Sequence, residues 1–231
     1  MNNDNFEYLN RQLQYLGFSD TLKDQLENNL KARSDSFNLS ATLSYSSSEK
    51  KEASYELHFR KGNEDMYFLN SYKATVGEQS GLFYVNKGEK NITSKEAFNL
   101  LEGRSVYREL TNKEGEKYYG WQKIDLENSE GEKIKFKTFT DNYGYDLEAA
   151  VKQVASKQLF FGLDKEKTMQ SLQKGNQVPV SNMDKSEKFF VAADPQFKSI
   201  EIYNENGIKL RLDDLNKEQA QTEKQSAGMK M

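Results

Sequence analysis

The sequence predicts an α+β protein with an N-terminal helical hairpin and antiparallel meander, followed by two related helix-plus-antiparallel-sheet modules. Three observations predict this class. Apolar residues recur at helical spacing up to about residue 32, and they alternate with polar residues along residues 37–76. Further along the chain, the order helix, glycine, three strands occurs twice. We expect the boundaries 1–78 for hairpin and meander, 79–158 and 159–210 for the two modules, and 211–231 for a flexible or helical polar tail.

Composition excludes several kinds of site. The 231 residues include no cysteine and one histidine, His58. Zinc sites and thiolate clusters need several Cys or His ligands, and a nucleophile–histidine pair would have to use His58. The sequence therefore predicts no metal and no disulfide.

Charge and hydropathy indicate a protein of the cytoplasm. The 33 basic and 36 acidic residues give a net charge of -3 and are interspersed, unlike the footprint of a generally basic nucleic-acid binder. No apolar run approaches the roughly 20 residues of a membrane span. The start of the chain, 1–5, lacks the basic and apolar regions of a signal peptide. We expect a cytoplasmic location without membrane association.

Two amphipathic helices are expected first. Leucines and Phe6 follow helical spacing up to Gly17, which offers a stop; Ser19 or Asp20 can cap a second helix. The apolar stripes consist of Phe6, Leu9, Leu13 and Leu16, then Leu22, Leu26 and Leu30. We favour packing of these stripes on the following sheet. The alternative is a partner-binding or dimerising face, which would make the protein an adaptor or a homo-oligomer.

An antiparallel meander of three strands should follow. Residues 37–45 and 53–59 alternate between apolar and polar, and a third run covers 66–76. The breaks between them are the polar segments 46–51 and 62–65. One face of this sheet is expected to meet solvent and to carry His58, which we interpret as a surface histidine.

The first module begins with a short strand at 82–85 and a helix. Thr93 and Glu96 form a capping-box pattern, and Gly103 ends the helix. Strands are predicted at 105–111, 117–126 and 133–140, with turns at 112–115 and 128–131, before a helix capped by Asp146.

The second module repeats this order in degenerate form. Asp164 caps a helix that Gly175 ends, and strands are expected at 178–181, 188–193 and 199–203. Residues 101–106 match 172–178 with one insertion, and 116–119 match 187–190. We interpret the copies, about 93–140 and 164–210, as a duplication. Helix–glycine–hairpin patterns that arise by chance are the alternative.

Catalytic motifs are not found. The chain has no Gly-rich phosphate-binding motif and no metal-ligand spacing of His or Asp residues. We therefore predict no catalytic residue and no cofactor, and a protein that is not an enzyme. An enzyme that works without metal or cysteine chemistry is the least favoured alternative.

One hairpin carries a candidate binding surface. If strands 117–126 and 133–140 pair around their turn, one face collects rings and lysines, and the other collects Ile124, Leu126, Ile134 and Phe136 as core. The candidate surface consists of Tyr119, Trp121, Lys123, Lys135, Lys137 and Phe139. Rings that stack bases and lysines that neutralise phosphates suit a single-stranded nucleic acid, and the lysines also suit an acidic protein. The alternative is that the helix at 146–157 covers the rings.

Three segments resemble a bacterial protein family. They are residues 92–104, 139–147 and 194–198, and the similarity extends over about 80–210. The sequence resembles proteins of Bacteroides-type gut bacteria that are grouped as domains of unknown function and associated with plasmids and conjugative elements. The resemblance implies a role in DNA maintenance or transfer of mobile elements, and it implies no catalytic residue. We thus expect a non-enzymatic interaction module that acts as an accessory protein with a nucleic-acid or protein partner.

Overall fold

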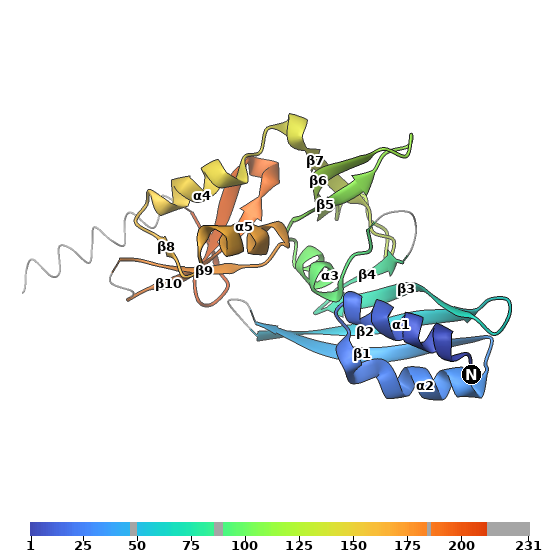
Figure 1. Ribbon diagram of the computed structural model, residues 1–231. Helices are drawn as coiled ribbons and strands as arrows, with labels where there is room; N and C mark the ends of the chain where they lie inside the picture. Colours follow the sequence, from blue (N-terminus) through green and yellow to red (C-terminus); the bar gives the residue numbers. More distant parts are fainter. Residues whose placement is uncertain (47–49, 86–89, 184–185, 212–231) are drawn as a thin grey trace, which may run out of the picture.

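The computed structural model confirms the α+β class. It describes residues 1–46, 50–85, 90–183 and 186–211 (Figure 1), which contain five α-helices and three antiparallel sheets. The predicted tail lies outside the described residues, except for Arg211. The helices lie in the chain between runs of antiparallel strands. They do not alternate with parallel strands, as expected for the α+β class.

The N-terminal part is a helical hairpin on a four-stranded sheet. The elements are α1 (Asn3–Tyr15), α2 (Lys23–Ala32), β1 (Ser36–Ser46), β2 (Lys50–Lys61), β3 (Tyr67–Val76) and β4 (Gln79–Tyr84), and the sheet order is β1-β2-β3-β4. Figure 1 shows both helices along one face of this sheet. Because β4 pairs with β3, with Phe83 opposite Tyr72, the expected three-stranded meander has a fourth strand. Our boundary at residue 78 therefore cuts through one sheet.

The leucine stripes of α1 and α2 are buried against this sheet. Every leucine of the two stripes is at most 3% exposed and belongs to one hydrophobic cluster with residues of β1–β4. Packing on the sheet, the favoured interpretation, is confirmed. The leucines themselves are therefore not open to a partner, and an adaptor or homo-oligomer role of these helices stays a prediction.

The first module contains α3 (Ser94–Leu101), β5 (Val106–Thr111), β6 (Lys117–Ile124) and β7 (Phe136–Thr140), followed by α4 (Leu147–Ala155). Thr93 and Glu96 form the predicted capping box, and Gly103 follows the helix with φ +77°. The strands pair in the order β5-β6-β7. The last strand begins three residues later than predicted, because residues 133–135 form a separate connection beside β4.

The second module contains α5 (Lys165–Gln173) and the strands β8 (Phe160–Phe161), β9 (Val178–Ser181), β10 (Lys188–Asp194), β11 (Ser199–Tyr203) and β12 (Lys209–Leu210). They pair in the order β12-β11-β10-β9-β8. Gly175 follows α5 with φ +75°, as Gly103 follows α3. Both modules thus have a helix, a positive-φ glycine and three neighbouring antiparallel strands in chain order. Their common descent stays a prediction.

Two hydrophobic clusters meet at the sheet β5–β7. Val106 and Ile124 belong to the cluster that also holds α1, α2 and β1–β4. Trp121 belongs to the cluster of the second module, with Tyr107 and Phe139 packed against it. Because neighbouring strand residues point to opposite faces, this one sheet contributes to both cores. It also forms one wall of the pocket described next.

Candidate functional site

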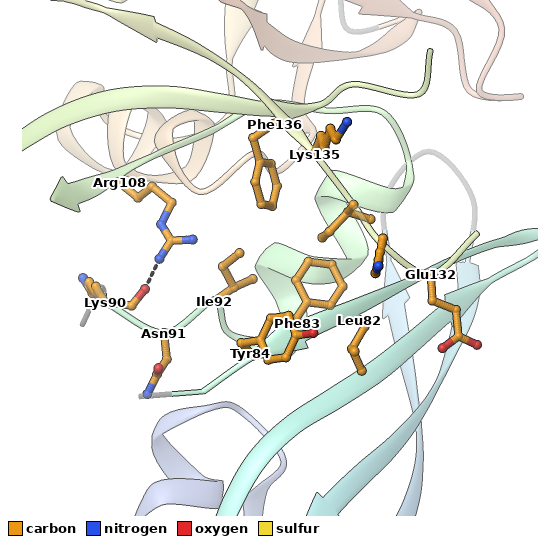
Figure 2. Close-up of a pocket in the computed structure, with 12 residues that line it drawn as sticks. Leu82, Phe83, Tyr84, Lys90, Asn91, Ile92, Arg108, Glu132, Lys135 and Phe136 are labelled. Atoms are coloured by element: carbon orange, nitrogen blue, oxygen red, sulfur yellow. Dashed lines mark hydrogen bonds between the residues drawn. The ribbon is translucent and has the colours of Figure 1, made fainter. Parts of the chain in front are cut away.

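A pocket of about 670 Å³ lies where β4 meets the connection into β7 (Figure 2). Four segments of the chain contribute its lining. The lining residues are Leu82, Phe83, Tyr84, Lys90, Asn91, Ile92, Arg108, Glu132, Lys133, Ile134, Lys135 and Phe136. We call this cavity the β4–β7 pocket. Its volume falls in the range of roughly 300–1,000 Å³ that is typical of ligand sites.

Backbone hydrogen bonds hold the two long walls of the pocket. The amide of Leu82 donates to the carbonyl oxygen of Glu132 at 2.9 Å, which fixes the connection beside β4. The amide of Asp125 donates to the carbonyl oxygen of Lys135 at 2.8 Å and fixes the other side of the same connection. The pocket therefore has walls that backbone pairing positions, not loose loops.

The interior of the pocket is apolar. Phe83 and Ile92 are buried members of the first hydrophobic cluster, and Ile134 and Phe136 pack against that cluster. Figure 2 shows Phe83, Ile92 and Phe136 around the centre of the cavity. Tyr84, which is 56% exposed, also lines the pocket. An apolar group that enters the pocket would lose its contact with water and gain contact with these side chains.

The charged lining residues are mostly basic. Lys90, Arg108, Lys133 and Lys135 line the pocket together with one acid, Glu132. The Glu132 carboxylate is 2.5 Å from the Lys73 ammonium, and this ion pair raises the pKa of Lys73. Within the part of the chain that the structure describes, Lys133 and Lys135 form no ion pair. The pocket thus combines an apolar interior with a net positive charge.

Arg108 brings a nearly buried cation to this site. Its side chain comes from β5 and its Nη2 donates a hydrogen bond to the backbone carbonyl oxygen of Lys90. The residue is only 7% exposed. A guanidinium has five N–H donors, and desolvation strengthens its attraction for an anion. The alternation Val106, Arg108, Leu110 places this arginine on an apolar strand face, and that pattern could have identified it from the sequence.

The lining offers binding chemistry more than catalytic chemistry. It contains no histidine, serine or threonine, so no activated nucleophile of the usual kind lies in it. Its single carboxylate is engaged with Lys73. Over the described ranges, no group of three His, Cys, Asp or Glu residues could hold a metal ion.

The predicted ring-and-lysine face has the expected register. Trp121 lies opposite Phe139, and Lys123 lies opposite Lys137, so these four side chains share one face of the sheet with Tyr119. Ile124 and Phe136 share the other face, as expected for core residues. Leu126, which we also expected in the core, is exposed because β6 ends at Ile124.

Trp121 is nevertheless covered and does not form a stacking platform. It is 6% exposed and lies in the second hydrophobic cluster with Leu147 of α4. Its ring centroid is 5.2 Å from that of Tyr107 and 5.5 Å from that of Tyr145. The structure thus corrects the stacking interpretation: the start of α4 covers the ring, and Tyr119, at 52% exposure, is the open ring of this face.

The remaining predicted residues share the sheet face but have contacts of their own. Lys137 pairs with Asp125 at 3.3 Å and with Glu127 at 3.5 Å, and the Asp125 carboxylate raises the pKa of Lys137. Phe139 packs against Tyr143, with ring centroids 4.9 Å apart. Lys123 is half-buried. Only Lys135 of the six lines the β4–β7 pocket, so the structure does not bring the predicted surface together as one site.

His58 takes the predicted surface position. Its Nε2 is 3.2 Å from a Glu56 carboxylate oxygen, and its Nδ1 is 3.2 Å from the Ser71 hydroxyl oxygen. All three side chains belong to the solvent face of β2 and β3. No helix within the described ranges is long and apolar enough to cross a membrane.

Searches with protein-family models, against curated proteins and against solved structures find no match to this chain.

Proposed function

We propose that this protein is a non-enzymatic interaction module whose β4–β7 pocket binds an acidic segment of a partner protein. An apolar side chain of that segment would enter the pocket. The observation that carries the proposal is the apolar pocket whose lining includes Lys133 and Lys135, two lysines that form no ion pair with any described residue. An apolar anchor in a pocket and charges around it are the usual arrangement of a protein-recognition site.

A protein segment fits this pocket better than a nucleic acid does. Single-stranded nucleic acids need exposed rings for their bases and several free cations for their phosphates. Trp121 is buried, and Lys137 is neutralised by Asp125 and Glu127. The apolar interior of the pocket instead suits an aliphatic or aromatic side chain. Acidic residues next to that side chain would meet Lys133 and Lys135.

The role in mobile-element DNA maintenance or transfer is a broader proposal. It is implied by the family resemblance alone, and the comparisons give it no support. A partner that carries an acidic, apolar segment is compatible with such a role, because an accessory protein can act by holding another protein at DNA. The cytoplasmic location likewise stays a prediction.

A fluorescent anion can test the pocket before the partner is known. The dye 8-anilinonaphthalene-1-sulfonate has an apolar body and one negative charge, and its emission rises in an apolar site. We expect a saturable signal, which a peptide of alternating leucine and glutamate displaces. A single-stranded oligonucleotide of equal charge should displace the dye less well, because it has no apolar side chain for the pocket.

Charge-reversal variants locate the binding. Lys133→Glu with Lys135→Glu should weaken dye and peptide binding by about tenfold, since two attractive charges become repulsive. The matched control is Lys113→Glu with Lys188→Glu, which reverses two exposed lysines outside the lining. Equal effects of the two double variants, with circular dichroism showing both folded, would overturn the proposal. Stronger displacement by the oligonucleotide would favour a nucleic-acid partner instead.

A further inference from the structure

A second groove carries the opposite charge from the β4–β7 pocket. It has a volume of about 350 Å³ and lies between β5, β6, the start of α4 and the helix α5. Three aromatic residues line it: Tyr107 and Tyr145, which are half-buried, and Trp121, which contributes the 6% of its surface that stays exposed. The other lining residues are Asp141, Asp146, Leu147, Glu148, Met169 and Gln173. We call this site the aromatic groove.

The rings of the aromatic groove are inclined to one another. The planes of Tyr107 and Trp121 make an angle of 48°, and those of Trp121 and Tyr145 make an angle of 67°. Neighbouring rings are in contact at these angles, so they present inclined surfaces to the groove, whereas a flat base would need parallel surfaces to stack on. This arrangement suits a compact, rounded group.

Contacts outside the groove fix these rings in place. The Tyr145 hydroxyl donates to the Ser199 carbonyl oxygen at 3.0 Å. The Tyr107 ring stacks on Tyr119, with centroids 5.6 Å apart and an interplanar angle of 25°. Trp121 is held by the second hydrophobic cluster. A ligand would therefore meet an arrangement that is formed in advance, which lowers the entropic cost of binding.

The charge of the groove is negative. Its lining includes three carboxylates and no lysine or arginine. Asp146 caps α4 by accepting from the Ala149 amide at 3.0 Å, and Glu148 pairs with Lys152 at 3.0 Å and Lys165 at 2.6 Å. Among the described residues, none forms an ion pair with the Asp141 carboxylate. That carboxylate raises the pKa of Tyr107, although burial is the larger cause.

We propose that the aromatic groove binds a methylated ammonium group, as carried by choline-like molecules and by methylated lysine side chains. The faces of Trp and Tyr rings attract cations, and quaternary ammonium is the group that aromatic cages bind most typically. Methyl groups have no hydrogen bonds to water that they would lose on contact with the rings. A bare ammonium would lose such hydrogen bonds. The Asp141 carboxylate adds long-range attraction. This site is separate from the β4–β7 pocket and does not depend on the function proposed for it.

The single tryptophan gives a direct reading of this groove. Because Trp121 is the chain's one tryptophan and lines the groove, a ligand that binds there should change its intrinsic fluorescence. The full chain is titrated with tetramethylammonium, choline and N-acetyl-trimethyl-lysine amide at constant ionic strength. The neutral isostere of choline, 3,3-dimethyl-1-butanol, has the same shape without the charge. We expect a saturable change with the cations and a much weaker one with the alcohol.

Variants decide whether the carboxylate takes part. Asp141→Asn should weaken binding of the cations by about threefold, as expected for one solvent-exposed charge. Asp24→Asn, an exposed acid on α2, is the matched control and should change nothing. The Trp121 indole N–H resonance shows whether each variant keeps its fold. Lys133→Glu with Lys135→Glu should leave this binding unchanged, which separates the two proposals.

The source of the ammonium group follows from the relative affinities. Tighter binding of the trimethyl-lysine derivative indicates a modified protein side chain, and tighter binding of choline indicates a small molecule. The proposal is overturned if the neutral alcohol binds as tightly as choline, if Asp141→Asn has no effect, or if no cation gives a saturable change.

Discussion

Single residues show how burial and charge oppose one another in this protein. Lys95 extends over two rings of the first core, with its Nζ 4.3 Å from the centroid of Tyr45 and 4.7 Å from that of Phe98. Cation–π attraction favours the charged form, but burial is the larger effect. Burial, with a smaller contribution from Arg104, lowers the pKa of Lys95 from 10.5 to about 8.

This depressed pKa predicts a pH dependence of stability. Between pH 8 and 10.5 the unfolded chain holds a proton on Lys95 that the folded chain has lost, so stability should rise with pH across this window. Below pH 8 the folded state carries the cost of the buried charge. Lys95→Met removes that cost and should be more stable than the unmodified protein by about 1 kcal/mol at pH 7, after allowance for solvent screening.

Urea unfolding at several pH values checks this expectation. The difference in free energy of unfolding between Lys95→Met and the unmodified protein should shrink as the pH rises from 7 to 10. Lys23→Met, which changes an exposed lysine of α2, is the control and should give a difference that does not depend on pH. If the difference in free energy of unfolding for Lys95→Met does not change with pH, the Lys95 ammonium of the unmodified protein is better solvated than its position indicates.

Among the elements, the ends of α3 and α5 contact one another through buried hydrogen bonds. Arg104 Nε donates to the Gly175 carbonyl oxygen at 2.9 Å, and its Nη2 donates to the Asn99 side-chain oxygen at 2.7 Å. Asn99 Nδ2 in turn donates to the Lys174 carbonyl oxygen at 2.7 Å. The two modules thus meet through the residues that end their helices, and these buried polar groups satisfy one another.

Gly175 allows this close approach, so its substitution should be costly. A Cβ at this position would lie 2.8 Å from the Ser105 carbonyl oxygen, and φ is +75°. At Gly115, φ is +84° and an added Cβ would have no neighbouring atom within 4 Å. Substitution of Gly115 therefore measures the cost of the positive φ without a steric clash. We expect Gly115→Ala to cost about 1 kcal/mol of unfolding free energy and Gly175→Ala to cost about 3 kcal/mol. Equal costs by urea unfolding would show that the contact can relax freely.

At the scale of the whole molecule, the sheet β5–β7 joins the two cores. Ile124 of β6 packs in the first cluster, and Trp121 of the same strand packs in the second. Neither cluster can lose its packing without disturbing a strand that belongs to both. This shared sheet favours a single cooperative unit, although the chain contains two helix-and-sheet modules.

Cooperative unfolding is therefore the expected behaviour. Trp121 fluorescence reports the second core, and far-ultraviolet circular dichroism reports all helices and sheets, so the two urea curves should coincide. Leu26→Ala, which truncates a fully buried side chain of α2, should shift both curves by the same amount, a loss of about 2–5 kcal/mol. A fluorescence transition that stays in place while the dichroism transition moves would show that the cores unfold separately.

The sequence by itself determined the elements and their faces. Local signals sufficed for the capping box at Thr93 and Glu96 and for the glycine stops, because these depend on residues a few positions apart. The alternation around Trp121 also gave the correct register of β6 and β7, since a slip by one residue would reverse both faces. It did not reveal that β4 joins the N-terminal sheet, because strand pairing is not encoded in periodicity.

Only the tertiary structure decided which faces meet water. Trp121 is buried because α4 packs over it, and the leucines of α1 and α2 are buried because the first sheet covers them. The β4–β7 pocket exists because Leu82 meets Glu132, residues that are far apart in the chain. Burial is a property of the complete set of contacts, so the sequence could predict the ring-and-lysine pattern but not its exposure. Of the six residues of the expected surface, Lys135 lines the β4–β7 pocket and Trp121 lines the aromatic groove, because packing separates the side chains that the pattern placed on one face.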